Sequence, residues 1–134
     1  MTQEDKDLLL CDLCARLPYG VKVQIKNEIV VLDSICDDDG YHFNFIGEDR
    51  EGANIEQVRP YLVPLSSMTE EQVEELYRCS GVMLRRSECI SLDFHVFEFT
   101  DLDNALKYLD RNHFDYRGLI PKCLALDATG LGIY

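Results

Sequence analysis

The spacing of apolar residues changes several times along this chain, and these changes constrain the fold more than any other feature. Apolar side chains recur every three or four positions near the N-terminus, alternate with polar ones between residues 21 and 45, and return to helical spacing after residue 69. They alternate again between residues 82 and 99 before a last helical stretch. A chain with these periods must combine helices and strands, so the sequence predicts the α+β class.

The first helix is expected over residues 2–17. Thr2 can cap it, and Pro18-Tyr-Gly20 ends it. Its apolar stripe should consist of residues at helical spacing, namely Leu9, Leu10, Leu13, Cys14 and Leu17.

Three or four short strands should follow. Residues 21–25 alternate, residues 29–36 are rich in β-branched side chains, and residues 41–45 alternate again. We expect turns at Asn27-Glu28 and at residues 37–40, where Asp-Gly suits a tight hairpin. A fourth strand within residues 55–63 would be confined by Pro60 to an edge or a strand end. The pattern predicts a small antiparallel sheet or an SH3-like barrel.

The C-terminal part should be helix, strand and helix. Thr69 and Gln72 form the pattern of a capping box, with Met68 placed to pack on Val73, and the helix should stop at Ser80-Gly81. Its apolar face should carry Val73, Leu76 and Tyr77. A β-like stretch covers residues 82–99. A third helix is expected over residues 101–112, capped by Thr100 or Asp101, with Asp103 and Lys107 as an ion pair. A short helix near residues 115–120 would end at Pro121.

At 134 residues the chain is expected to form a single domain. Residues 1–66 would supply the first helix and the sheet, and residues 67–134 the α/β C-terminal part.

The net charge of −12 is spread along the chain and limits the classes of partner. Spread negative charge repels phosphate backbones and anionic membranes, so we expect no unaided nucleic-acid or membrane binding. No apolar run has the length of a membrane span, and the acidic start is unlike a secretion signal, which favours the cytoplasm. An acidic surface can also mimic nucleic acid and block a basic partner.

The six cysteines are expected to be reduced and mostly buried as small apolar side chains. Cys11 and Cys14 match Cys-x-x-Cys, but no second pair at zinc spacing exists, and the pair does not begin a helix after a strand. Core packing is therefore favoured over redox or metal use, and the sequence predicts no metal site and no cofactor.

The densest group of chemically useful side chains is His113, Asp115, Tyr116 and Arg117. Together they offer a proton carrier, a carboxylate, a phenol and a guanidinium directly after a predicted helix. We take them as candidate binding residues. The structural alternative is that His113 closes the helix and Asp115 caps the next turn.

Three separated blocks carry a resemblance to other proteins. They are residues 12–22 (DLCARLPYGVK), 60–71 (PYLVPLSSMTEE) and 113–120 (HFDYRGLI). These blocks resemble a group of short uncharacterised proteins of Bacteroides-type gut bacteria, often met in phage-related or mobile regions of those genomes. The resemblance implies a bacterial or phage setting. It transfers no activity and no catalytic residue.

Three functional hypotheses follow. The first is a non-enzymatic module that binds another protein, because no catalytic motif is present. The second is an acidic mimic of DNA that inhibits a basic protein. The third is an enzyme that uses His113, Asp115 and Arg117. The oligomeric state and the partner are not indicated by the sequence.

Overall fold

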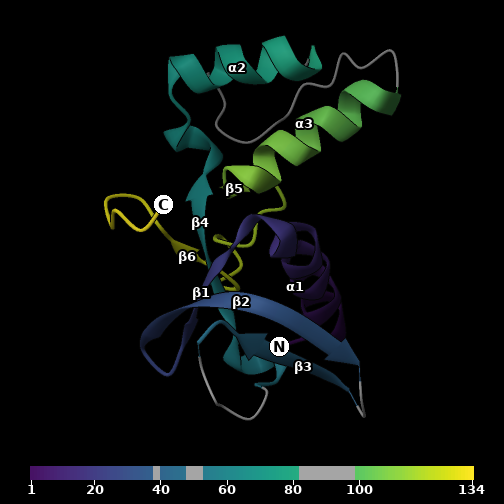
Figure 1. The fold of residues 1–134 in the computed structure, drawn as a ribbon, viewed down its shortest axis with the longest axis vertical. Coiled ribbons are helices and arrows are strands. Elements are labelled where there is room, and N and C mark those ends of the chain that lie inside the picture. The colour runs from purple at the N-terminus through teal and green to yellow at the C-terminus, as the bar shows by residue number, and fades with distance from the viewer. Residues whose placement is uncertain (38–39, 48–52, 82–98) are drawn as a thin grey trace.

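The computed structural model describes residues 1–37, 40–47, 53–81 and 99–134, and its fold is α+β as the sequence predicts (Figure 1). The main elements are helices α1 (Gln3–Arg16), α2 (Glu70–Ser80) and α3 (Phe99–Arg111) and strands β1 (Lys22–Ile25), β2 (Glu28–Asp37), β3 (Tyr41–Phe45), β4 (Arg59–Pro64), β5 (Phe114–Asp115) and β6 (Leu126–Asp127). Three short 3₁₀ turns, Leu17–Tyr19, Ile55–Gln57 and Leu65–Ser67, join them.

Helix α1 begins where the sequence predicts, but it buries a different face. The Thr2 hydroxyl accepts a hydrogen bond from the backbone N–H of Asp5 at 3.1 Å, which caps the helix. Leu9 and Leu13 are buried, whereas Cys14 is exposed, so its expected place in the apolar stripe is wrong. Asp12 and Arg16 occupy the buried positions beside the two leucines. The buried face therefore includes charged side chains that an apolar pattern cannot reveal.

Strands β1, β2 and β3 form an antiparallel meander, and β4 pairs with β1, giving the order β3-β2-β1-β4-β5. The turn between β1 and β2 is made by Lys26 and Asn27, both with positive φ, one residue earlier than expected. Pro60 lies near the start of β4, a position where its missing N–H is tolerated. Strand β4 itself lies inside the sheet rather than at its edge.

The sheet is mixed, because β5 and β6 both pair with β4 in the parallel direction. These two-residue strands were not expected from the sequence. The helix expected near residues 115–120 is also wrong, since residues 116–125 form turns after β5. Gly118, with φ of 75°, takes a conformation in this segment that favours glycine.

Helix α3 begins two residues earlier than expected, so Thr100 and Asp101 lie within it rather than before it. The expected ion pair is present, with Lys107 Nζ 2.8 Å from Asp103 Oδ2. A strand was expected over residues 82–99, of which residues 82–98 lie outside the described part of the chain. Phe99, the last residue of that range, belongs to helix α3.

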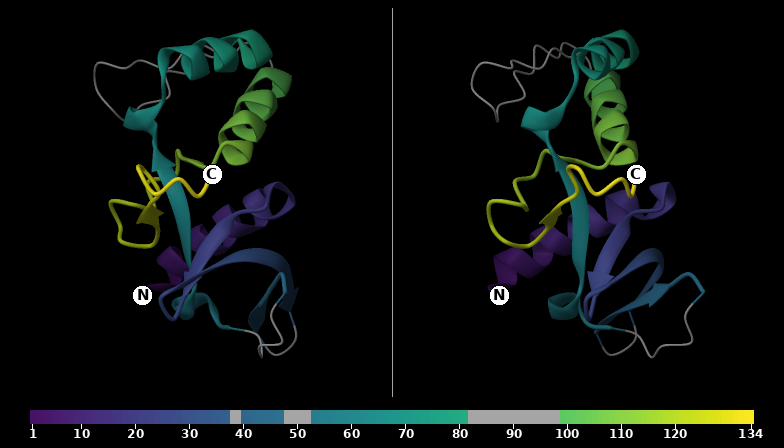
Figure 2. Two further views of the ribbon diagram at one scale, coloured as in Figure 1. Left: turned by 60° about the vertical axis from the view of Figure 1, so that its left-hand side comes forward. Right: turned by 90° about the vertical axis from the view of Figure 1, so that its left-hand side faces the viewer.

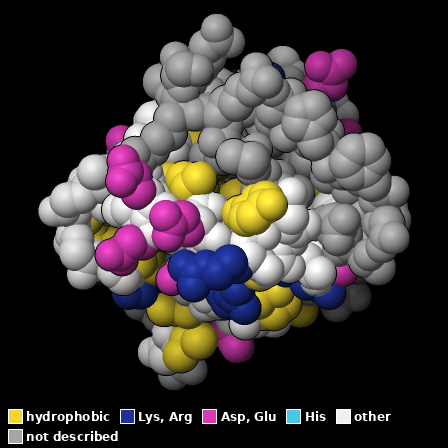
Figure 3. Space-filling model, turned by 90° about the horizontal axis from the view of Figure 1, so that it is seen from above, with side chains coloured by type: hydrophobic (Ala, Val, Ile, Leu, Met, Phe, Trp, Pro, Cys, Tyr) yellow, Lys and Arg dark blue, Asp and Glu magenta, His cyan; other side chains and the backbone are white. Residues whose placement is uncertain are grey.

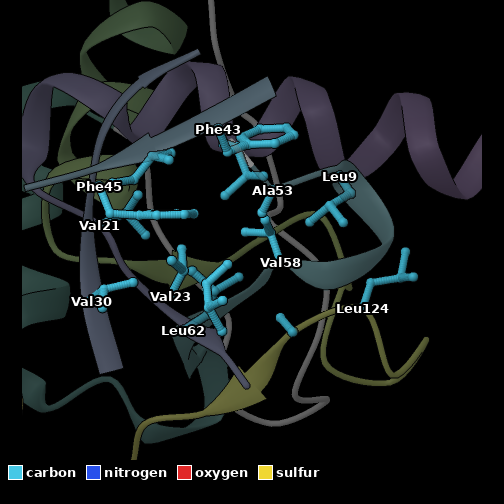
Figure 4. Close-up of a cluster of buried hydrophobic side chains, with 14 of the residues drawn as sticks. Leu9, Val21, Val23, Val30, Phe43, Phe45, Ala53, Val58, Leu62 and Leu124 are labelled. Atoms are coloured by element: carbon cyan, nitrogen blue, oxygen red, sulfur yellow. The ribbon is translucent and has the colours of Figure 1, made fainter. Parts of the chain in front are cut away.

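Within the described residues the buried apolar side chains form two clusters, and β4 contributes to both (Figures 1 and 2). In the first cluster α1 packs against the sheet, and its buried members are Leu9, Leu13, Val21, Val23, Ile25, Val30, Leu32, Phe43, Phe45, Ala53, Val58, Leu62, Leu119, Leu124 and Ala125 (Figure 4). The second cluster lies under α2 and α3, with Leu65, Met68, Leu76, Ala105, Tyr108, Leu109 and Phe114.

Helix α2 has the capping box that its sequence predicts. Thr69 Oγ1 accepts from the N–H of Gln72 at 3.2 Å, and Gln72 Oε1 accepts from the N–H of Thr69 at 2.9 Å. Met68 and Val73 belong to the same cluster, as the expected staple requires. Gly81, with φ of 74°, ends the helix. Tyr77 is 53% exposed, so its expected place on the buried face is wrong.

The substitution Thr69→Ala is expected to lower the free energy of unfolding by about 1 kcal/mol, because it leaves the N–H of Gln72 without its acceptor. Thr69→Ser keeps a hydroxyl acceptor and should retain most of this stability. Urea unfolding followed by circular dichroism measures both. Equal losses in the two variants would contradict a capping role for the hydroxyl.

Candidate functional site

The candidate residues 113–117 lie directly after α3 and are mostly buried. His113 and Asp115 are 6% and 7% exposed, and Tyr116 and Arg117 are half-buried. His113 has a positive φ of 61°, and its carbonyl accepts from the N–H of Val63 on β4 at 2.8 Å. The segment is therefore fixed to the sheet through its backbone.

A network of four charged side chains, one of them Arg117 itself, connects this segment to α1 and α3. Arg16 is fully buried, and its Nε donates to Asp12 Oδ2 at 2.9 Å while its Nη2 donates to the carbonyl of Phe114 at 2.6 Å. Arg117 Nη1 donates to Asp12 Oδ1 at 2.8 Å and to Asp110 Oδ1 at 3.3 Å. Two guanidinium groups thus balance two carboxylates, which offsets part of the cost of burying the charges, while Nη1 of Arg16 is buried without a hydrogen-bond partner. We call these four residues the buried charge network.

The network joins parts of the chain that are distant in sequence. Asp12 and Arg16 belong to α1, Asp110 to the end of α3, and Arg117 to the turn after β5. It fixes α1, which packs in the first apolar cluster, to the end of α3, which packs in the second.

Tyr116 is part of the same arrangement. Its hydroxyl donates to Asp110 Oδ1 at 2.8 Å, and its ring lies 4.3 Å from the guanidinium carbon of Arg117 and 5.6 Å from that of Arg16. Burial raises the pKa of its phenol well above the ordinary value, with the charge of Asp110 acting in the same direction. Tyr116 is therefore protonated at neutral pH and acts as a hydrogen-bond donor.

The imidazole of His113 stacks on the ring of Tyr134, with centroids 3.9 Å apart and planes 15° from parallel. Burial lowers the pKa of His113 to about 4, and the charges of Arg16 and Lys22 act in the same direction. The hydroxyl of Tyr134 donates to the carbonyl of Tyr61 at 2.8 Å. Its position is also held by the N–H of Lys22, which donates to it at 2.9 Å. At neutral pH His113 is an uncharged packing residue.

Asp115 has the capping role of the structural alternative. Its two carboxylate oxygens accept from the N–H groups of Leu119 and Ile120 at 2.8 and 2.9 Å. This pair of bonds closes the turn after β5.

The four candidate residues therefore come together, but as a packed interior. An apolar hollow of about 210 Å³ lies beside them, bordered by Asp115 and Tyr116, and neither His113 nor Arg117 lines it. Sequence reasoning missed their partners Asp12, Arg16, Asp110, Lys22 and Tyr134. One signal was available, because Asp12 and Arg16 interrupt the apolar side of α1 at a spacing of four, as a buried ion pair would.

The exposed surface carries an apolar group on the outer side of the sheet. Val23 and Val30 face each other inward, which turns Ile29 and Val31 outward on the same strand. Ile46 lies beside Val31, to whose carbonyl its N–H donates at 3.0 Å. Ile29 and Ile46 are 47% and 60% exposed. We call Ile29, Val31 and Ile46 the apolar sheet face.

The segment 130–134 adjoins this face through Lys22, the residue opposite Val31 in the register. Lys22 Nζ donates to the carbonyl of Ile133 and lies 5.5 Å from the centroid of the Tyr134 ring. Tyr134 is 47% exposed.

The exposed carboxylates of the described residues are dispersed over several elements. They lie on α1 (Glu4, Asp7), β2 (Glu28, Asp33, Asp37), the 3₁₀ turn Ile55–Gln57 (Glu56), α2 (Glu70, Glu71, Glu74, Glu75), α3 (Asp103) and β6 (Asp127). Several are paired, as Glu56 is with Lys6 and Glu74 with Arg78. At the end that carries α2, acidic groups lie beside basic and hydrophobic ones (Figure 3).

The five cysteines of the described segments, Cys11, Cys14, Cys36, Cys79 and Cys123, are free and exposed. The expectation that cysteines are mostly buried is therefore wrong for these five. Within those same segments, no group of three or more His, Cys, Asp or Glu side chains is placed to hold a metal ion.

Of the helices in the described ranges, none has both the length and the apolar character needed to cross a membrane. The chain matches no protein-family model, no curated protein and no solved structure.

Proposed function

We propose that this protein is a non-enzymatic module that binds another protein through its apolar sheet face. The supporting observation is that Ile29, Val31 and Ile46 lie together on the outer side of β2 and β3, with two of them about half exposed. Single exposed apolar residues are common on protein surfaces, whereas adjacent ones on one face mark a contact surface.

The charge of the protein defines the chemistry of the partner. A net charge of −12 attracts basic proteins and repels acidic ones. Glu28, Asp33 and Asp37 are exposed along β2, the strand that carries most of the apolar sheet face. The proposed partner therefore presents an apolar ridge flanked by lysine and arginine side chains. In the setting that the sequence resemblance implies, it is a cytoplasmic protein of a Bacteroides-type host, a phage or a mobile element.

The test compares capture by three forms of the tagged protein in lysate of a Bacteroides strain. The wild type is expected to retain a basic protein that the double variant Ile29→Ser/Ile46→Ser loses. Tyr77→Ser removes an equally exposed apolar side chain from α2, and it should capture as the wild type does. Capture should weaken as salt rises, because exposed charges are screened.

Two results would count against this proposal. If the double variant captures the same protein as the wild type, the apolar sheet face is not the contact. If the wild type captures no protein above background, the binding function fails as a whole.

The second candidate function is that of a DNA mimic. It also implies a basic partner, but this partner would bind acidic side chains of α2 instead of the apolar sheet face. It is favoured by Glu70, Glu71, Glu74 and Glu75, four exposed glutamates on two turns of α2. Glu75 accepts from the Tyr108 hydroxyl at 2.9 Å, so not all four are free to imitate phosphates. Duplex DNA should displace the captured protein if this candidate holds, and Glu71→Gln/Glu74→Gln should weaken capture more than Ile29→Ser/Ile46→Ser.

The enzymatic hypothesis receives no support from the residues that motivated it. Asp115, Tyr116 and Nη1 of Arg117 make internal hydrogen bonds, and His113 is buried against Tyr134.

A further inference from the structure

The exposed side of α1 presents two thiols one turn apart. Leu9 and Leu13 face the interior, and the opposite positions, Asp7, Cys11 and Cys14, face solvent. Both cysteines are free. Cys11 and Cys14 lie three positions apart on this side of the helix, so their side chains are neighbours on its surface. Their expected role as packing residues is excluded by their exposure.

The geometry of a helix decides what this pair can form. Side chains three positions apart have Cβ atoms about 5–6 Å apart. A disulfide needs Cβ atoms about 3.5–4.5 Å apart, so closing one between Cys11 and Cys14 would distort α1. A metal ion bound by both sulfurs lies between them, so the sulfurs need not approach to bonding distance and the Cβ atoms can keep their helical separation.

The number of ligands selects the kind of ion. Among the described residues no third His, Cys, Asp or Glu completes a metal site, so any bound ion must accept two sulfurs from the protein. Structural zinc takes four protein ligands and is disfavoured here. Thiolates prefer soft ions, and Cu(I) is the common soft ion for such ligands.

We propose that Cys11 and Cys14 form a two-thiolate binding site for Cu(I) on the solvent side of α1. Binding replaces two S–H bonds by two Cu–S bonds: one Cu⁺ and two thiols give a bis-thiolate complex of charge −1 and two protons. No electron is transferred. The released protons make the affinity increase with pH.

The test is a competition for Cu(I) supplied as its coloured complex with bathocuproine disulfonate, in anaerobic buffer with ascorbate. The wild type is expected to withdraw one Cu(I) per chain. Cys11→Ser and Cys14→Ser should each weaken the affinity roughly 10²–10⁴-fold, the gain that a second linked ligand provides. The matched control Cys79→Ser/Cys123→Ser removes two exposed thiols elsewhere and should bind as the wild type does.

Circular dichroism establishes that the variants fold, which exposed Cys→Ser changes should permit. The proposal is overturned if each single variant keeps wild-type affinity, or if the control loses as much copper as the α1 variants. It is also overturned if size-exclusion chromatography shows that copper is held between two chains, since the site would then not belong to one helix.

Discussion

Replacing Arg16 with methionine is expected to lower the free energy of unfolding by about 3–5 kcal/mol, the usual cost of removing one partner from a buried ion pair. Methionine fills much of the same volume but cannot balance Asp12 or bond the carbonyl of Phe114. Arg117 would then be the one guanidinium left to the carboxylates of Asp12 and Asp110 within the buried charge network. Chemical denaturation followed by circular dichroism measures the loss.

A matched control is available on α2. Arg78 also pairs with an acid four residues away, Glu74, at 3.9 Å, but both side chains are more than 70% exposed. Arg78→Met should therefore change stability by less than about 0.5 kcal/mol. If Arg16→Met costs no more than Arg78→Met, the network does not hold the helices together.

Lowering the pH from 6.5 to 4 is expected to destabilise the protein through His113, by about 3 kcal/mol at most. Its pKa falls from the ordinary 6.5 to about 4 in the folded protein, because of burial and the charges of Arg16 and Lys22, with Asp12 acting in the opposite sense. Between these values the unfolded chain takes up a proton that the folded protein does not. The stability that the folded protein gains from uncharged His113 is therefore complete above pH 6.5, declines as the pH falls, and is lost below pH 4.

The measurement is the free energy of unfolding against pH for the wild type and for His113→Asn. Asparagine tolerates the positive φ of this position and carries no proton in this range. The variant should be less stable at pH 7, but its free energy of unfolding should change less with pH between pH 6.5 and 4. His42→Asn on β3 makes the same substitution at another histidine and serves as the matched control. An unchanged slope in His113→Asn would show that other groups cause the acid sensitivity.

The features predicted from the sequence are those whose causes lie within a few residues. The capping box at Thr69 and Gln72 and the Thr2 cap depend on neighbours three residues away, and both are present. The alternation of Val21, Val23 and Ile25 likewise reflects one buried face of one strand. Such features can be predicted because the residues that determine them lie next to one another in the sequence.

The features that were missed depend on partners far away in the chain. Arg16 is buried because its guanidinium reaches the carbonyl of Phe114, 98 positions later, and Asp12 is buried with it. Cys14 therefore stays on the outer side of α1 although its spacing fits the apolar stripe. Strands β5 and β6 have two residues each, too few for any period to be recognised. The candidate group 113–117 was identified, but its partners on α1 were not.

Three members of the first apolar cluster, Leu119, Leu124 and Ala125, come from the far end of the described chain, whereas Leu9 and Leu13 come from its first helix. During synthesis on the ribosome, α1 and the meander emerge long before these residues. The nascent chain must then keep one side of its first cluster open until residues 119–125 have been made, and apolar surface exposed in this interval favours misassembly. Completion of this cluster therefore depends on a segment made more than 70 residues after the meander.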